Sequence, residues 1–244
     1  MSAPLESTAG DGFRPVMRRT GMRRTLLALA VSLACLGGLA FSIDLDTARW
    51  CKTGHIPREL MRFLNFSEVF GHGLGVATLL LAAVVLDPSL AGRRATLRFG
   101  RLPLSRDCAR MIAATFAGGI LANVVKEAAI DRVRPRAADL SQAVSALATF
   151  GNTMATHITS HSDINSFPSG HAATAAGLAA ALSWKYPRGV WLFGGLAASV
   201  AMQRVASSAH YPSDVLLGAA LGLACAAIFV GKVPPQQAVN QTAC

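Results

Sequence analysis

Six apolar runs divide this chain, and they constrain its fold more than any other feature. The segments between the runs are short, polar and rich in arginine, and only 15% of all residues are charged, against about 25% in a typical soluble domain. The runs cover residues 25–43, 69–86, 111–125, 172–184, 189–203 and 215–231. This alternation predicts an all-α fold, a polytopic membrane bundle of about six transmembrane helices.

The arginines predict the orientation of this bundle. Six spans leave both termini on one side, together with the basic 87–110 loop and the 185–188 turn. Positively charged segments stay in the cytoplasm, so that side is the cytoplasmic one. The opposite side receives residues 44–68, 126–167 and 204–214. A chain rich in Ala and Arg with few Lys indicates a GC-rich bacterial genome, and therefore an inner membrane with these segments on the periplasmic face.

The same pattern predicts three parts of the chain. Residues 1–24 form a disordered basic cytoplasmic N-terminus, residues 25–232 the membrane domain and residues 233–244 a C-terminal tail. The first apolar run could instead be a cleaved signal peptide, since basic residues precede it and small residues lie near Ala40. Residues 44–68 are expected to form an amphipathic segment at the membrane interface.

A net charge of +10 also raises the question of nucleic-acid binding. The arginines, however, lie between apolar runs, where they set topology and meet anionic lipid head groups. No recognisable nucleic-acid motif is present, so we expect the membrane, and no nucleic acid, as the partner. The sequence gives no indication of the oligomeric state.

The last interrupted span carries the first chemical signal. His210 and Asp214 would share one face of a helix that Pro212 begins. A carboxylate beside an imidazole orients the ring and leaves its other nitrogen free as a nucleophile. Arg204 adds a cation at the end of the preceding run. A His–Asp pair that only caps a helix would have the same spacing.

A second signal, Pro168-Ser169-Gly170-His171, begins the fourth run. Pro and Ser are typical of helix starts, and Gly allows close approach of the backbone to a ligand. The N–H groups at a helix N-terminus bind phosphate readily, which makes Ser169 and Gly170 candidate ligands. His171 would then donate a proton to a leaving oxygen. A motif this short also occurs by chance.

The third signal is basic. Lys126 ends the third run, and Arg134 follows in the polar connection. Arginine suits bidentate phosphate recognition, and lysine supplies a point charge, although an ordinary basic patch at a membrane surface would look the same. All three signals fall on the outer side of the predicted topology. Charged groups at such depths usually face a bundle interior or a water-filled cavity.

Together the three signals resemble the signature of the type 2 phosphatidic acid phosphatase family, whose active site is related to that of vanadate-dependent haloperoxidases. The signature is Lys, six residues, Arg-Pro; then Pro-Ser-Gly-His; then Ser-Arg, five residues, His, three residues, Asp. The second element matches fully at Pro168–His171, and the third matches at Arg204, His210 and Asp214. The resemblance implies hydrolysis of lipid phosphate monoesters or pyrophosphates, with no metal or other cofactor.

The resemblance also implies a role for each residue. His210 would be the nucleophile and form a phosphohistidine, while Asp214 would orient and polarise it. His171 would protonate the leaving group and then activate water. The non-bridging phosphate oxygens would be held by Lys126, Arg134, Arg204 and the backbone N–H groups of Ser169 and Gly170.

The first element departs from the signature, because seven residues rather than six separate Lys126 from Arg134. On an unbroken helix the extra residue would turn the side chain by about 100°. Asp131 and Pro135 indicate that the helix has already ended, so a loop can absorb the insertion. Arg132 is a competing candidate for the arginine role.

Two other positions bear on the chemistry. Gln203 stands where the family usually has Ser, and it keeps the ability to form hydrogen bonds. His157 and His161 are four residues apart, as in some metal sites, but no carboxylate-rich shell surrounds them in the sequence. We therefore expect no bound metal.

Two alternatives to a hydrolase are open at this point. A phosphotransferase would use the same phosphohistidine and pass the phosphate to a lipid or sugar acceptor. A non-catalytic lipid-binding relative would be expected to lose the nucleophile or the acid, whereas His171, His210 and Asp214 are all present. The sequence does not distinguish among phosphatidic acid, phosphatidylglycerol phosphate, polyprenyl pyrophosphate and a lipid A phosphate as substrate.

Overall fold

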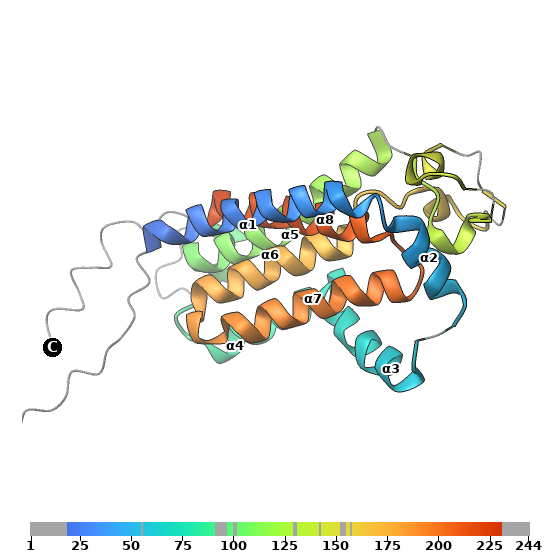
Figure 1. Ribbon diagram of the computed structural model, residues 1–244. Coiled ribbons are helices and arrows are strands. Elements are labelled where there is room, and N and C mark those ends of the chain that lie inside the picture. Colours follow the sequence, from blue (N-terminus) through green and yellow to red (C-terminus); the bar gives the residue numbers. More distant parts are fainter. Residues whose placement is uncertain are drawn as a thin grey trace, which may run out of the picture.

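The computed structural model describes most of the chain. The predicted tail at 233–244, residues 1–18 of the predicted N-terminal segment, and His157 lie outside the described residues. Those described are 19–54, 56–90, 97–99, 102–128, 131–141, 143–151, 155–156 and 158–230. One helix corresponds to each predicted apolar run (Figure 1): α1 (Arg19–Ala40), α4 (Gly73–Leu86), α5 (Arg106–Ala128), α6 (Gly170–Lys185), α7 (Val190–Ala206) and α8 (Pro212–Phe229).

The lengths of these helices differ. Among the described residues, α1, α5 and α8 are long and apolar enough to cross a membrane, and a bent pair, Arg58–Phe70 with Gly73–Leu86, makes a fourth candidate. Helices α6 and α7 have 16 and 17 residues. On the cytoplasmic side of the predicted topology, a short antiparallel hairpin of β1 (Leu97–Phe99) and β2 (Leu102–Leu104) lies between α4 and α5.

The N-terminal boundary is a correction to the sequence prediction. Helix α1 begins at Arg19, so the last part of the segment predicted to be disordered, residues 19–24, is helical. The helix extends beyond the apolar run because Leu26 is buried in the core of the bundle and Met22 packs against the same core. Arginine is also a good helix former, so the basic cluster does not interrupt the helix.

Helix α6 lies at the centre of the bundle. Every residue from Ala172 to Trp184 is buried, and α5, α7 and α8 all pack against this helix. The side chains at these contacts are small, which allows the backbones to approach closely. At Gly222 of α8 a Cβ atom would collide with the backbone carbonyl of Ala173, and at Gly218 it would collide with that of Ser169. The start of α6 is therefore fixed against α8.

The predicted amphipathic segment at 44–68 forms helices at one end of the bundle. These are α2 (Asp44–Lys52) and α3 (Arg58–Ser67), followed by the 3-10 turn η1 (Glu68–Phe70). The α3–η1 segment meets α4 at an angle of 65°. This bend directs η1 and the first residues of α4 toward the ends of α6 and α7, where Gly71 packs against His171 and Val200.

The long connection between α5 and α6 folds back on itself at the same end of the bundle, opposite the start of α1 and the end of α8 (Figure 1). Its backbone pairs through Arg132 N–H to Ile164 O at 2.8 Å and Ser166 N–H to Arg132 O at 2.9 Å. This pairing brings the segment after α5 beside the segment that precedes α6. The connection contains the 3-10 turns η2 (Pro135–Ala137), η3 (Ala146–Thr149) and η4 (His161–Ile164), while η5 (Pro187–Gly189) joins α6 to α7.

Candidate active site

The predicted nucleophile and its carboxylate lie side by side at the start of α8. The Nδ1 atom of His210 is 3.6 Å from Oδ2 of Asp214, and both side chains are almost fully buried. Because Nδ1 faces the carboxylate, the other ring nitrogen, Nε2, is the one left for a ligand. His210 precedes the helix, and its backbone N–H donates to the carbonyl of Arg204 at 3.1 Å.

Asp214 is held by several donors. It occupies the first turn of α8, where its Oδ2 accepts the backbone N–H of Tyr211 at 2.9 Å. The same oxygen accepts a 2.5 Å hydrogen bond from Ser166 Oγ, and that hydroxyl also lies 3.4 Å from Nδ1 of His210. A carboxylate with this many donors stays ionised and in one orientation. Ser166 therefore contacts both members of the pair.

His171 is placed by the N-terminus of α6. Ser169 caps that helix by accepting the N–H of Ala172, and its own N–H donates to the backbone carbonyl of Asp214 at 3.0 Å. These bonds fix the start of α6 to the start of α8. They also engage the N–H of Ser169, so the prediction that this group binds phosphate is wrong. His171 lies within electrostatic range of His210, and its ring centroid is 5.9 Å from that of His72 at the start of α4.

The predicted cations gather around the two histidines. Lys126 lies in the last turn of α5, and its Nζ is 3.6 Å from where a Cβ of Gly170 would be. Arg134 has extended backbone beyond the end of α5, as Asp131 and Pro135 predicted. Arg204 lies in the last turn of α7. The structure thus brings all three sequence elements to one end of the bundle.

Arg132, the competing candidate, lies elsewhere. Its side chain is fully buried and makes ion pairs with both Asp44 and Asp214. Each of its three guanidinium nitrogens donates to a buried protein group, so it does not face the space between the histidines. Arg134 is half-buried; its Nε donates to the carbonyl of Ser162 at 2.7 Å, and its charge interacts with those of Arg204 and Lys126.

Arg204 contacts the side chains of Glu68 in η1 and of Gln203 in its own helix. One terminal nitrogen makes a 2.7 Å ion pair with Glu68 of η1, and its Nε donates to Gln203 Oε1. Gln203, the residue that departs from the family signature, also donates from its Nε2 to Asn65 of α3 at 3.0 Å. The substitution of Ser by Gln therefore links α7 to the amphipathic segment.

The electrostatics suit a neutral nucleophile among cations. Burial lowers the pKa of His210 to about 4, against the opposing effect of the Asp214 carboxylate, so the ring is neutral at pH 7. Burial and the charge of Arg136 lower the pKa of Arg134 to about 10, so this group stays protonated at pH 7. Among the described residues, no three His, Cys, Asp or Glu side chains lie close enough together to hold a metal ion.

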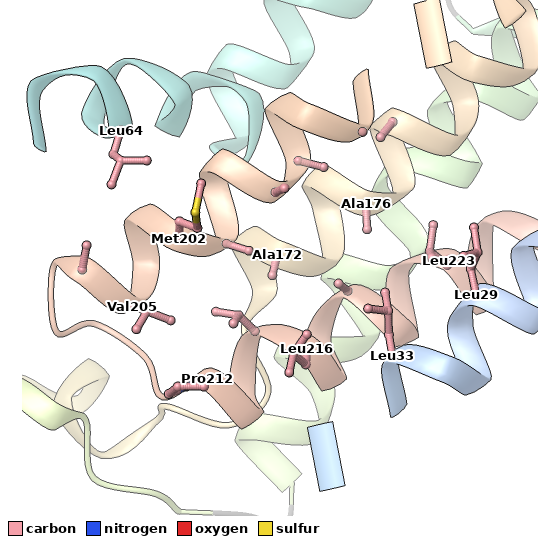
Figure 2. Close-up of a pocket in the computed structure, with 18 of the residues that line it drawn as sticks. Leu29, Leu33, Leu64, Ala172, Ala176, Met202, Val205, Pro212, Leu216 and Leu223 are labelled. Carbon is pink, nitrogen blue, oxygen red and sulfur yellow. The ribbon is translucent and has the colours of Figure 1, made fainter. Parts of the chain in front are cut away.

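A groove of about 820 Å³ lies among these helices. Its lining is largely apolar and comes from α1, α2, α3, α6, α7 and α8, with Leu33, Met202 and Leu216 among the residues drawn in Figure 2. Leu216 follows Asp214 by two positions, and such residues face away from each other on a helix. The apolar lining suits hydrocarbon, and it includes Ala172 and Val205, the residues that follow His171 and Arg204 in the chain.

Membrane helices carrying a buried His–Asp pair, a second histidine and clustered cations define a class of phosphate-handling membrane proteins. The model of the PAP2 superfamily matches residues 108–237, which is more than half of the chain and includes every predicted site residue. The chain therefore belongs to the PAP2 superfamily, and the predicted resemblance is confirmed.

Curated relatives match over a shorter stretch. The lipid A 1-phosphatase of Rhizobium etli is 38% identical over 104 residues, which are 43% of this chain and 40% of that protein. The lipid A 1-phosphatase of Rhizobium johnstonii is also 38% identical over 104 residues, 43% of this chain and 38% of that protein. The chain thus matches about two fifths of the length of these relatives.

Solved structures of two bacterial proteins share the fold. LpxE of Aquifex aeolicus superposes with a TM-score of 0.55 at 19% identity, covering 79% of this chain and 97% of that one. A transmembrane PAP2 type phosphatidylglycerolphosphate phosphatase of Bacillus subtilis gives a TM-score of 0.56 at 20% identity, covering 91% and 98%. At these identities the likeness concerns the fold, and it confirms the predicted helical membrane bundle.

Several residues at the site were not found from the sequence. Ser166 belongs to no motif, and only its proximity to Pro168 in the chain hints at its place. Glu68 and Asp44 come from a segment predicted only to lie at the interface. Their contacts depend on how separate helices meet, which residue spacing does not encode.

Proposed function

We propose that this chain is a metal-independent membrane phosphatase that hydrolyses a lipid phosphate monoester or pyrophosphate through a phosphohistidine at His210. One observation carries the proposal: the buried imidazole of His210 is backed by Asp214 and has His171 and the cations within electrostatic range. Membership of the PAP2 superfamily supports phosphate chemistry. The lipid A 1-phosphatases among its relatives make a lipid A phosphate the first substrate to test.

In the first step, Nε2 of His210 bonds to phosphorus as the bond from phosphorus to the leaving oxygen breaks. The negative charge of the bound phosphate favours the protonated form of His171. His171 gives its proton to the leaving oxygen, which releases a lipid alcohol or, from a pyrophosphate, a lipid monophosphate. The new P–N bond leaves positive charge on the imidazole. Asp214, 3.6 Å from Nδ1, stabilises this charge.

In the second step, neutral His171 takes a proton from water as the water oxygen bonds to phosphorus. The P–N bond breaks, its electron pair returns to Nε2, and inorganic phosphate leaves. The charge on the non-bridging oxygens in both steps is stabilised by Lys126, Arg134 and Arg204, together with the N–H group of Gly170 at the start of α6. The N–H of Ser169 already donates to the carbonyl of Asp214, so it has no part in this scheme. Every group in this scheme is a protein side chain or backbone amide.

We further propose that the site faces the periplasm from the bacterial inner membrane. Its residues lie at the end of the bundle opposite the 185–188 turn, and Lys185 and Arg188 of that turn favour the cytoplasm. A periplasmic site would meet lipid head groups of the outer leaflet. This orientation is tested by introducing single cysteines at Ser141 and Arg188 and labelling them with a membrane-impermeant maleimide. If only the cysteine at position 188 were labelled in intact spheroplasts, the site would face the cytoplasm instead.

The activity is tested by phosphate release from purified protein in detergent with EDTA. The substrate panel is a lipid A 1-phosphate, phosphatidylglycerol phosphate, phosphatidic acid and a polyprenyl pyrophosphate. We expect EDTA-resistant release that disappears in His210→Ala and persists in His161→Ala, which changes an exposed histidine of the outer connection. Activity retained by His210→Ala, or no release from any lipid, would contradict the proposal. Transfer of radiolabel to a lipid acceptor without free phosphate would identify a phosphotransferase.

A further inference from the structure

The second carboxylate oxygen of Asp214, Oδ1, has partners other than His210. This oxygen accepts a hydrogen bond from a terminal nitrogen of Arg132, and both side chains have no exposed surface. The Arg132 guanidinium is also enclosed by aromatic rings, with its central carbon 4.0 Å from the ring centroid of Tyr211 and 4.7 Å from that of Phe150. Its Nε donates to Thr149 Oγ1 at 2.9 Å. These contacts together hold the Arg132 guanidinium in place.

A second carboxylate completes this arrangement. Asp44, the first residue of α2, is fully buried and accepts the other terminal nitrogen of Arg132 at 2.7 Å. Asp44 also accepts both the backbone N–H and the hydroxyl of Ser213, the residue directly before Asp214. The carboxylate of Asp44 therefore receives donors on both oxygens.

The balance of charge in this cluster explains why two carboxylates are needed. Arg132 and Asp214 alone would form a neutral pair, and a neutral pair gives little stabilisation to a cationic imidazole. With Asp44 the cluster holds two carboxylates and one guanidinium, so one negative charge is left in excess. In a buried site that charge acts over a short distance with little screening. It lies next to the ring that becomes positive when phosphorus bonds to His210.

We propose that Asp44 and Arg132 are positioning residues that fix Asp214 against His210 and keep a net negative charge behind the nucleophile. Neither touches substrate; both act through Asp214. The proposal rests on the proposed phosphohistidine reaction, and it gives α2 a role that its place outside the three sequence elements does not suggest. It also explains why a buried arginine precedes Arg134 by two residues: one guanidinium supports the carboxylate, and the other faces the phosphate.

The test is Asp44→Asn, which keeps the shape of the side chain and removes its charge. We expect kcat for the best lipid substrate to fall by about 10- to 100-fold, the range known for groups that orient metal-binding histidines, with KM within about twofold of wild type. Vanadate takes a fifth ligand as phosphorus does in the transition state, so its inhibition constant should rise about tenfold. The inhibition constant of inorganic phosphate should not change.

The matched control is Asp46→Asn, on the same helix, whose carboxylate is 81% exposed and pairs only at the surface with Arg49. If Asp44→Asn does not fold, Thr149→Val tests the same proposal. This variant removes the acceptor of Arg132 Nε and leaves every charge in place. It should give the same pattern with a smaller loss of kcat. An unchanged kcat, or an equal weakening of vanadate and phosphate, would overturn the proposal. Wild type and His210→Ala report separately on the phosphatase assignment.

Discussion

Glu68 and Arg204 form an ion pair in which Oε1 of the carboxylate lies 2.7 Å from a terminal nitrogen of the guanidinium. Arg204 is one of the three proposed phosphate-binding cations, whereas Glu68 comes from η1, on the far side of the bend between α3 and α4. The carboxylate therefore occupies a donor that a phosphate oxygen would bind. A substrate has to compete with Glu68 for Arg204.

The first prediction follows from this competition. Glu68→Gln should lower KM for a lipid phosphate by about two- to fivefold, because a partly exposed pair is worth no more than about 1 kcal/mol. The change in kcat should be smaller. Initial rates in mixed micelles measure both constants. Glu59→Gln is the control, since Glu59 pairs with Arg62 on the exposed face of α3. A higher KM in Glu68→Gln would mean that the carboxylate holds Arg204 in place.

The second prediction concerns the contact between α8 and the start of α6. Gly218→Ala should lower both activity and thermal stability, because its Cβ would meet the backbone of Ser169, which caps the helix that carries His171. Overpacking of this kind costs about 1–3 kcal/mol. Gly38→Ala on α1 is the control, as nothing lies within 4 Å of a Cβ there. Equal stability of the two variants would show that α8 can move away without cost.

The third prediction tests Ser166. Ser166→Ala removes a 2.5 Å hydrogen bond to Asp214 and a contact with His210, so kcat should fall about tenfold, as expected for one hydrogen bond to a charged group. KM should stay close to that of wild type, because Ser166 does not bind the phosphate. Ser141→Ala, in the exposed part of the same connection, should have wild-type kinetics. A change in KM alone would place Ser166 among the substrate ligands instead.

Much of the bundle could be predicted because it depends on local composition. Each apolar run became one helix, and the end of α5 before Arg134 followed from Asp131 and Pro135. The start of α1 could not be found in this way. The contacts of Met22 and Leu26 decide where that helix begins, and hydropathy treats the arginines beside them as an interruption.

The residues of the site also fall into those that the local sequence predicts and those whose place depends on long-range contacts. The proximity of His210 and Asp214 is local, so their spacing predicted it, but the shared helix face was wrong, because His210 precedes α8 and only Asp214 lies on that helix. The assignment of Arg132 and Arg134 could not be, since their neighbouring side chains point to different partners only after residues 131–166 fold back onto the bundle. Asp44 is still further away in the chain. Its pairing with Arg132 depends on where α2 meets α8, which no residue pattern specifies.

The last prediction concerns pH and the buried state of His210. Burial lowers the pKa of this ring to about 4 in the folded protein, whereas the unfolded chain has the ordinary value of 6.5. Between these values the unfolded state binds more protons than the folded one. The stability that His210 contributes is therefore complete above about pH 6.5 and is lost as the pH falls toward 4.

At pH 5 this linkage should cost the wild type about 2 kcal/mol relative to pH 7, and His210→Asn should be free of that part of the loss. Thermal unfolding in detergent, followed by tryptophan fluorescence at both pH values, gives the difference between the two proteins. His161→Asn should behave like wild type, because His161 is exposed. If His210→Asn and wild type lost equal stability on acidification, the pKa of His210 would be the same in the folded and the unfolded protein, and burial would not be what keeps the ring neutral. Its Nε2 would then become protonated as the pH falls below about 6.5, and a protonated nitrogen cannot attack phosphorus, so this comparison bears on the nucleophile as well as on stability.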